Sequence, residues 1–185
     1  MKQTPISNIE GISITSRKIS SDSRGSFVKI EPKAQLEFPL TSVAFSINPK
    51  MGTLRGLHFQ TEPYAEEKIV SCVQGSIYDI LLDIRPDSKT LGMWAAIEIS
   101  SENNSQIYIP KGVAHGFQTL EPDSIVQYCL TSQYSERHSY SINPLLYPQF
   151  VWPHEANLVS PRDTSGITLE EAIQEYRISL TNITR

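Results

Sequence analysis

Short apolar segments alternate with turn-forming residues along the first 130 or so residues of the chain. Segments rich in Ile, Val, Leu, Tyr and Phe are separated by Gly, Pro, Asn, Asp and Ser, which is typical of an all-β sandwich or barrel. We predict strands at 11–19, 26–31, 42–48, 53–60, 67–74, 76–85, 93–100, 105–110, 114–120 and 124–132.

The segment 76–85 indicates how these strands are oriented. Its even positions from 78 to 84 are all apolar, whereas Asp79 and Asp83 interrupt the odd positions. Side chains two residues apart share one face of a strand. We therefore expect the odd face to line a polar cavity.

The pattern changes after about residue 132. Asn143-Pro144, Tyr147-Pro148 and Trp152-Pro153 favour extended, loop-like backbone. The Thr-x-x-Glu spacing at 168–171 is that of a capping box, and apolar residues follow at helical spacing. We expect one domain over 1–185, with a barrel core at about 11–132, a wrapping segment from 133, and a C-terminal helix at about 168–179.

The composition of the chain argues against several classes of function. The 185 residues carry a net charge of −4 and a pI near 5.6, which argues against nucleic acid or an anionic membrane as partner. Apolar runs fall far short of the roughly 20 residues of a membrane helix, and the first residues lack the apolar core of a signal peptide. We expect a cytoplasmic protein in which Cys72 and Cys129 are buried thiols rather than a disulfide.

Two apolar segments contain polar residues that need an explanation. Gly52–Gln60 reads GTLRGLHFQ and carries Arg55 and His58, while His115 follows a Pro-Lys-Gly turn. Polar groups inside a barrel cost stability unless they are used. Arg55 and His58 would point to opposite faces of a regular strand, so they share a site only if Gly56 permits a bulge, or Arg55 serves another part of a ligand.

The segment Pro110-Lys-Gly-Val-Ala-His115 resembles the second sequence motif of the cupins, which implies an all-β, cupin-type jelly-roll barrel. A metal-binding cupin also carries a His-x-His pair, whose imidazoles lie on one strand face and share an ion. This chain has His58-Phe-Gln60 at that position. We therefore expect no catalytic metal.

A more specific resemblance covers nearly the whole chain. Its most specific blocks are Leu-Arg-Gly-Leu-His and Ala-His-Gly-Phe, and the collinear motifs resemble those of the dTDP-4-dehydrorhamnose 3,5-epimerases. The matching segments are Asp22–Phe27, Gly52–Gln60, Lys68-Ile-Val, Asp79–Arg85, Ile109–Phe117, Tyr128, Tyr134, Trp152-Pro153 and Ser160–Asp163.

The resemblance implies a cofactor-free epimerase that inverts C3 and/or C5 of a nucleotide-diphosphate-linked 4-keto-6-deoxy sugar. It implies that His58 is the base and that Asp163 pairs with it. Lys68 would stabilise the enolate at the 4-keto oxygen, and Tyr128 would return a proton from the opposite face.

The resemblance also implies a homodimer with an exchanged N-terminal strand and a substrate-binding set. Arg55 and Arg24 would hold the diphosphate, and Tyr134 would stack on the base together with Phe27 of a neighbouring subunit. The sequence does not distinguish Asp79 from Asp83 as the carboxylate at the sugar pocket, and a purely structural role is the alternative for either one. The implied binding residues are Arg24, Phe27, Arg55, Gln60, Asp79, His115 and Tyr134.

The chain departs from the family pattern at three places. Lys29 stands where the family usually has Glu, Val43 where it has Gln, and 139–144 lacks the acidic residues common in the bifunctional enzymes. The nucleotide base and the number of inverted carbons therefore stay open. The alternative functions are a sugar 3,4-ketoisomerase on the same fold and a non-catalytic sugar-binding cupin.

Overall fold

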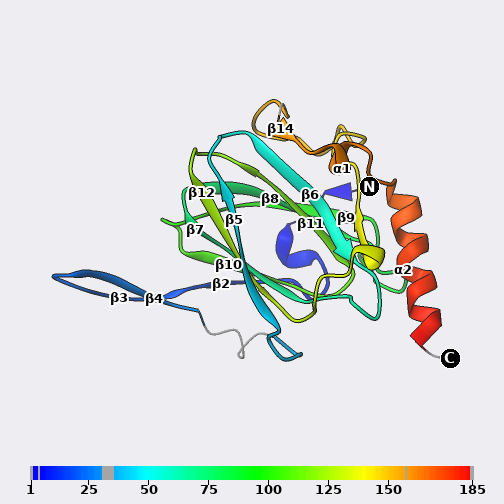
Figure 1. Cartoon of the computed structure of the whole chain (residues 1–185), viewed down its shortest axis with the longest axis horizontal. Coiled ribbons are helices and arrows are strands. Elements are labelled where there is room, and N and C mark those ends of the chain that lie inside the picture. The colour runs from blue at the N-terminus through cyan, green and yellow to red at the C-terminus, as the bar shows by residue number, and fades with distance from the viewer. Residues whose placement is uncertain (1, 4, 31–35, 157, 184–185) are drawn as a thin grey trace.

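The computed structural model describes residues 2–3, 5–30, 36–156 and 158–183. Its central feature is a pair of β-sheets that face each other (Figure 1). The larger sheet has the order β1-β9-β8-β11-β6-β13, and β14 pairs with β6. Its strands are β1 (Lys2–Gln3), β9 (Met93–Ser100), β8 (Ser76–Asp83), β11 (Val113–Thr119), β6 (Thr53–Gln60), β13 (Ser139–Ser141) and β14 (Leu158–Val159).

The smaller sheet has the order β2-β10-β7-β12-β5, with antiparallel neighbours throughout. Its strands are β2 (Ser13–Ser16), β10 (Ser105–Ile109), β7 (Lys68–Gln74), β12 (Ser124–Leu130) and β5 (Ser42–Asn48). The all-β class is confirmed.

The predicted strand at 11–19 is wrong as a single strand. The chain breaks at Arg17 into β2 and β3 (Lys18–Asp22). The buried Arg17 side chain donates to the carbonyl of Ser100 at 3.2 Å, and its backbone N–H donates to Asn104 O at 2.9 Å. These bonds end the pairing of β2 and turn the chain out of the sheet.

β3 and β4 (Gly25–Lys29) form a hairpin that extends far from the barrel (Figure 1). Every residue of the two strands is exposed. We call residues 18–29 the arm; Glu31, the last residue of the predicted strand 26–31, lies outside the described residues. The buried Glu67 carboxylate holds the chain beyond the arm by accepting from the backbone N–H groups of Glu37 and Phe38 at 3.1 and 3.0 Å.

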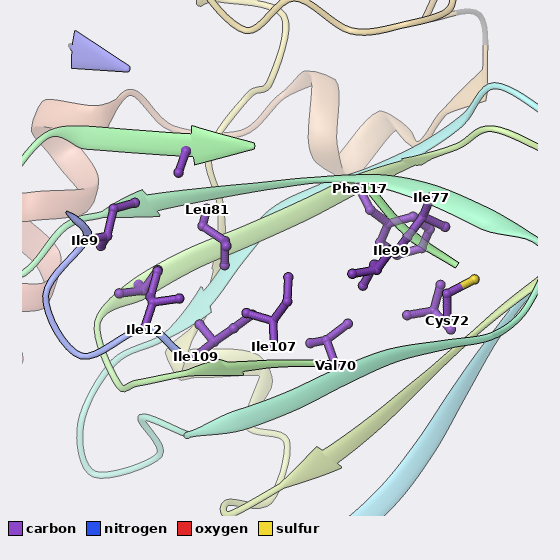
Figure 2. Close-up of a cluster of buried hydrophobic side chains, with 13 residues drawn as sticks. Ile9, Ile12, Val70, Cys72, Ile77, Leu81, Ile99, Ile107, Ile109 and Phe117 are labelled. Carbon is purple, nitrogen blue, oxygen red and sulfur yellow. The ribbon is translucent and has the colours of Figure 1, made fainter. Parts of the chain in front are cut away.

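Apolar side chains fill the space between the two sheets (Figure 2). β8 contributes Ile77 and Leu81 from its odd face to this core. The expectation that the odd face of 76–85 lines a polar cavity is therefore wrong for most of the strand. Asp79, between those two residues, is the exception described below.

A second core forms between the outer face of the larger sheet and the C-terminal helix α2 (Leu169–Ile183). Leu57, Phe59 and Trp94 pack here with Leu169 and Tyr176 of the helix. The helix begins at the predicted capping box, where Glu171 accepts from the backbone N–H of Thr168 at 2.8 Å, and it runs four residues past the predicted end at 179.

Other predictions concern thiols and membranes. Cys72 and Cys129 are both free and buried, as predicted. None of the helices in the described parts of the chain is long and apolar enough to cross a membrane. The remaining helices are short: η1 (Ile6–Asn8), η3 (Glu136–His138) and α1 (Pro161–Thr164).

Candidate active site

A bulge in β6 brings Arg55 and His58 to the same side of the strand. The register pairs His58 with His115 and Arg55 with Phe117, so Gly56 and Leu57 together oppose Gly116. Two residues opposite one is the definition of a bulge. Gly56 has φ +100°, and a Cβ there would lie 2.6 Å from the carbonyl oxygen of His115. Of the two alternatives that the sequence leaves open, the structure shows the bulge at Gly56.

Arg55 and His58 line a pocket of about 220 Å³ between the sheets. The base and acid candidates face this pocket from different sheets: His58 lies on β6 of the larger sheet, and Lys68 and Tyr128 lie on β7 and β12 of the smaller one. We call it the inner pocket. Its lining residues are Ser46, Arg55, His58, Lys68, His115, Phe117 and Tyr128.

A second pocket of about 210 Å³ shares His58, Lys68 and Tyr128 with the inner pocket. We call it the outer pocket; Tyr134 and Arg162 also line it. His58, Lys68 and Tyr128 therefore lie between the two pockets and line both of them.

His58 is held by a buried carboxylate. Its Nε2 lies 2.6 Å from Asp163 Oδ1, and the Asp163 side chain is only 3% exposed. Asp163 lies on α1, where Ser160 caps the helix and accepts from the Asp163 backbone N–H at 3.2 Å. Segments more than 100 residues apart in the chain therefore meet at this pair.

The protonation of the pair follows from the carboxylate. Burial raises the pKa of Asp163, but the hydrogen bond and charge of His58 and the hydroxyl of Ser141 outweigh it and hold the pKa at about 2. An ionised carboxylate only accepts hydrogen bonds. Nε2 of His58 must therefore carry the shared proton, which leaves Nδ1 of the neutral ring with a free lone pair to act as a base.

Lys68 and Tyr128 supply donors from the opposite sheet. Lys68 Nζ lies 3.1 Å from Glu66 Oε1, and both side chains are about one-tenth exposed. Burial raises the pKa of the Tyr128 hydroxyl, Asp79 raises it further, and Arg55 opposes the shift. Tyr128 therefore keeps its proton at neutral pH and is able to donate it.

His115 and Asp79 form a second buried pair. His115 Nε2 lies 2.9 Å from Asp79 Oδ2, with side chains 4% and 0% exposed. Burial raises the pKa of Asp79, and the charge of His115 opposes the shift. His115 lines the inner pocket and Asp79 supports it from behind.

The structure separates the two aspartates that the sequence leaves equivalent. Asp83 binds Arg85 Nη2 at 2.7 Å and also accepts from the hydroxyls of Ser88 and Thr90 at 2.6 Å. These bonds hold the pKa of Asp83 below its usual value although burial alone would raise it. Asp83 is the structural carboxylate of the two.

Besides His115, three of the predicted binding residues line the two pockets. Arg55 donates through Nε to Asn48 Oδ1 at 2.8 Å, and Tyr134 is 66% exposed at the rim of the outer pocket. The Gln60 amide bonds the carbonyls of Tyr64 and Gln133 and accepts from the backbone of Ser135. Gln60 therefore also fixes the segment that carries Tyr134.

Arg24 and Phe27 lie on the arm rather than beside the pockets of their own barrel (Figure 1). Phe27 is 70% exposed, and Arg24 Nη2 forms an ion pair with Asp22 at 2.7 Å. The structure therefore does not bring Arg24 and Phe27 together with the other predicted binding residues.

Sequence reasoning missed several site residues. Glu66 and Arg162 line the outer pocket, Ser141 donates to Asp163, and Asn48 holds Arg55. Glu66 stands two residues before Lys68, and Arg162 directly precedes Asp163. Closeness in sequence to a predicted site residue was therefore a signal for both. Among the residues that the structure describes, no group of three or more His, Cys, Asp or Glu side chains is placed to hold a metal ion.

Comparison with known proteins assigns the family. The family model described as dTDP-4-dehydrorhamnose 3,5-epimerase matches residues 6–171. The chain belongs to this family. An Escherichia coli enzyme of that name is 34% identical over 176 residues, which cover 90% of this chain and 94% of the relative. A Sinorhizobium fredii enzyme of that name is 45% identical over 130 residues, which cover 68% of this chain and 66% of the relative.

Solved structures of the family share the fold. The Bacillus anthracis dTDP-4-dehydrorhamnose 3,5-epimerase, with TDP and pyrophosphate bound, gives a TM-score of 0.80 at 31% identity and covers 87% of this chain and 95% of its own. The Legionella pneumophila enzyme, in complex with dTDP-4-keto-L-rhamnose, gives 0.81 at 33% identity, with 88% and 90% covered. The predicted cupin-type jelly-roll barrel is confirmed.

Proposed function

We propose that this chain epimerises a nucleotide-diphosphate-linked 4-keto-6-deoxy sugar at C3 and/or C5, by removing and returning a proton next to the ketone. The observation that carries the proposal is the inner pocket, where His58 with its buried Asp163 faces Lys68 and Tyr128 across the two sheets. Inversion at carbon needs a base and an acid on opposite faces of the sugar.

Each residue has a step in the proposed reaction. His58 Nδ1 takes the α-proton, and the carboxylate of Asp163 stabilises the resulting imidazolium. The ammonium of Lys68 stabilises the negative charge that develops on the 4-keto oxygen. Tyr128 then donates its proton to the opposite face of the enolate, which inverts the carbon. His115, supported by Asp79, and Gln60 bind the sugar end of the substrate.

In this proposal the remaining binding residues contact the diphosphate and the nucleotide base. The guanidinium of Arg55, whose Nε is held by Asn48, binds phosphate oxygens, because its fork of N–H donors matches their geometry. Tyr134, exposed at the rim of the outer pocket, stacks on the nucleotide base. The reaction uses no cofactor.

We also propose a homodimer in which each arm reaches the partner's pockets with Arg24 and Phe27. The arm projects away from its own barrel (Figure 1). Val43, Phe45 and Ile47 of β5 are 48%, 58% and 64% exposed, and such an apolar stripe favours burial against another subunit. Nothing in this arrangement calls for nucleic acid or a membrane as a partner, and we place the protein in the cytoplasm.

Incubation in deuterated water with dTDP- and GDP-linked 4-keto-6-deoxy sugars tests the function. NMR would count the carbons that exchange and the carbons that invert. Exchange and inversion at C3, at C5 or at both would support an epimerase. The number of inverted carbons would distinguish a 3,5-epimerase from a 3-epimerase, an activity that one of the relatives is named for. A ketone moved to C3 would instead show a 3,4-ketoisomerase, and binding without exchange would show a non-catalytic cupin.

A further inference from the structure

One hydroxyl group shares the carboxylate oxygen that holds His58. Ser141 ends β13, where it pairs with His58 of β6. Its Oγ donates to Asp163 Oδ1 at 2.7 Å, and the same oxygen lies 2.6 Å from His58 Nε2. Ser141 is only 6% exposed, so bulk water does not compete for this contact.

The second oxygen of Asp163 is held less closely. Oδ2 accepts from the backbone N–H of Gly56 at 3.4 Å, which is long for a hydrogen bond. The Ser160 hydroxyl also stabilises the ionised carboxyl group, as a smaller contribution than that of either His58 or Ser141. The two short contacts, both at Oδ1, are therefore the main ones that orient the carboxyl group. Removing one of them leaves the imidazole as the principal partner of that oxygen.

The two donors also share the negative charge. A hydrogen bond to the ionised form of a group stabilises that form, and the Ser141 hydroxyl contributes in this way to the low pKa of Asp163. A carboxylate whose charge is partly neutralised by a hydroxyl attracts an imidazolium less strongly. Ser141 therefore lowers the proton affinity that Asp163 confers on His58.

We propose that Ser141 is a positioning residue that acts on His58 through Asp163, by orienting the carboxylate and moderating its charge. The inference deepens the proposed function, because it assumes that His58 is the base. Its effect on the His58 ring is nevertheless measurable without any substrate.

Other charged and titratable groups surround His58. The ring lies in pockets lined by β5, β6, β7, β11, β12 and β13, by the loops that carry Glu66 and Tyr134, and by α1. Ser141→Ala leaves all of these groups in place, so a changed titration of His58 points to the oxygen shared with Asp163. The groups are Arg55, Glu66, Lys68, Asp79 behind His115, His115, Tyr128, Tyr134 and Arg162.

The experiment is an NMR titration of the full chain with labelled histidine rings. The chain has four histidines, and the His58 signal is assigned by its loss in His58→Gln. We expect the His58 ring signal to titrate at higher pH in Ser141→Ala than in the wild type, because the carboxylate that faces the ring loses a donor that shares its charge. Ser141→Thr, which keeps the hydroxyl, should titrate as the wild type does.

Ser124→Ala is the matched control. Ser124 is a fully buried serine on β12 whose Oγ donates to the carbonyls of Ser76 and Glu121, away from the pockets. The Ser124→Ala variant should lose some thermal stability, and its His58 titration should be unchanged. An unchanged or lowered pKa of His58 in Ser141→Ala, or an equal rise in Ser141→Thr, would overturn the proposal.

Activity provides a separate reading. If the proposed function holds, the acid limb of the solvent-exchange rate should move to higher pH in Ser141→Ala by the same amount as the ring titration. If the wild-type protein exchanges no substrate proton, the proposed function is wrong. The ring titration would still test the role of Ser141 in that case.

Discussion

Removing a proton from carbon next to a ketone requires a base with a free lone pair and a means of stabilising the charge that it acquires. In the proposed reaction His58 meets both needs through its two ring nitrogens. The shared proton with Asp163 occupies Nε2, so Nδ1 is free, and the ionised carboxylate stabilises the imidazolium. In the proposed reaction Tyr128, whose raised pKa keeps it protonated, has the opposite task of donating a proton.

His58→Ala should abolish solvent exchange at the carbon next to the ketone, with nucleotide affinity nearly unchanged. Loss of a general base typically costs about 10²- to 10⁴-fold in rate, and the alanine removes no group assigned to the nucleotide. Deuterium incorporation followed by NMR measures the exchange, and calorimetry with dTDP measures the affinity. More than a tenth of wild-type exchange would reassign the base.

Tyr128→Phe should separate exchange from inversion. The change removes only the hydroxyl and keeps the ring, which makes a T-shaped contact with His115 with centroids 6.0 Å apart. His58 can still form the enolate and return a proton from its own side, so exchange continues while inverted product falls sharply. NMR of the product in deuterated water measures both.

Tyr134→Phe is the control for the acid. Tyr134 is mostly exposed at the rim of the outer pocket, where stacking needs the ring rather than the hydroxyl. Turnover should be largely spared. Normal inversion by Tyr128→Phe together with failure of Tyr134→Phe would exchange the roles of the two tyrosines.

At the scale of elements, the bulge in β6 determines whether a site exists. Without the extra residue opposite Gly116, Arg55 and His58 would lie on opposite faces of the strand. Gly56 makes the bulge possible because a side chain would meet the neighbouring strand, with His115 O at 2.6 Å and Gly116 Cα at 2.7 Å from its Cβ.

Gly56→Ala should therefore destabilise the protein by about 2–5 kcal/mol, the sum of an unfavourable positive φ and a clash with backbone. Gly92→Ala is the matched control, since Gly92 also has a positive φ, +73°, but an added Cβ meets nothing within 4 Å. It should lose only about 1–2 kcal/mol. Chemical denaturation measures both, and equal losses would show that the close approach at Gly56 does not matter.

Alternation of apolar and polar residues was enough to predict most strands, because each buries one face against the core. It failed where that rule is broken. β13 and β14 are too short to show a period, and Arg17 is buried although its sequence context is that of a strand residue. Asp79 and Asp83 occupy the same face of β8, so only the positions of their partners separate them.

The site was predictable where residues with distinctive chemistry stand in distinctive motifs, as His58, His115 and Asp163 do. Its supporting residues were not. Ser141 and Asn48 are common polar residues, and their roles depend on meeting Asp163 and Arg55 from distant or bulged parts of the chain. Sequence spacing does not report such contacts.

For the whole molecule, independence from metal is a prediction of the proposed mechanism. In that mechanism Lys68 and Tyr128, which line the inner pocket, polarise the substrate, and His115 is already bonded to Asp79. Activity should survive a strong chelator, and elemental analysis of the purified protein should find no stoichiometric metal. One tightly bound transition metal per subunit, removable with loss of activity, would contradict this.

Assembly is testable by mixing two inactive proteins. In the proposed dimer each complete site combines His58 of one barrel with Arg24 and Phe27 of the partner's arm. A double variant, Arg24→Ala with Phe27→Ala, mixed with His58→Ala should form hybrids with one intact site. Random reassortment puts half of the dimers in this class, so inversion should recover to about a quarter of the wild-type rate.

As the control, His58→Ala mixed with Lys68→Ala should recover nothing, because both residues belong to one barrel. Light scattering must show dimers in each case; a monomer, or equal recovery in the two mixtures, would contradict the exchanged arm.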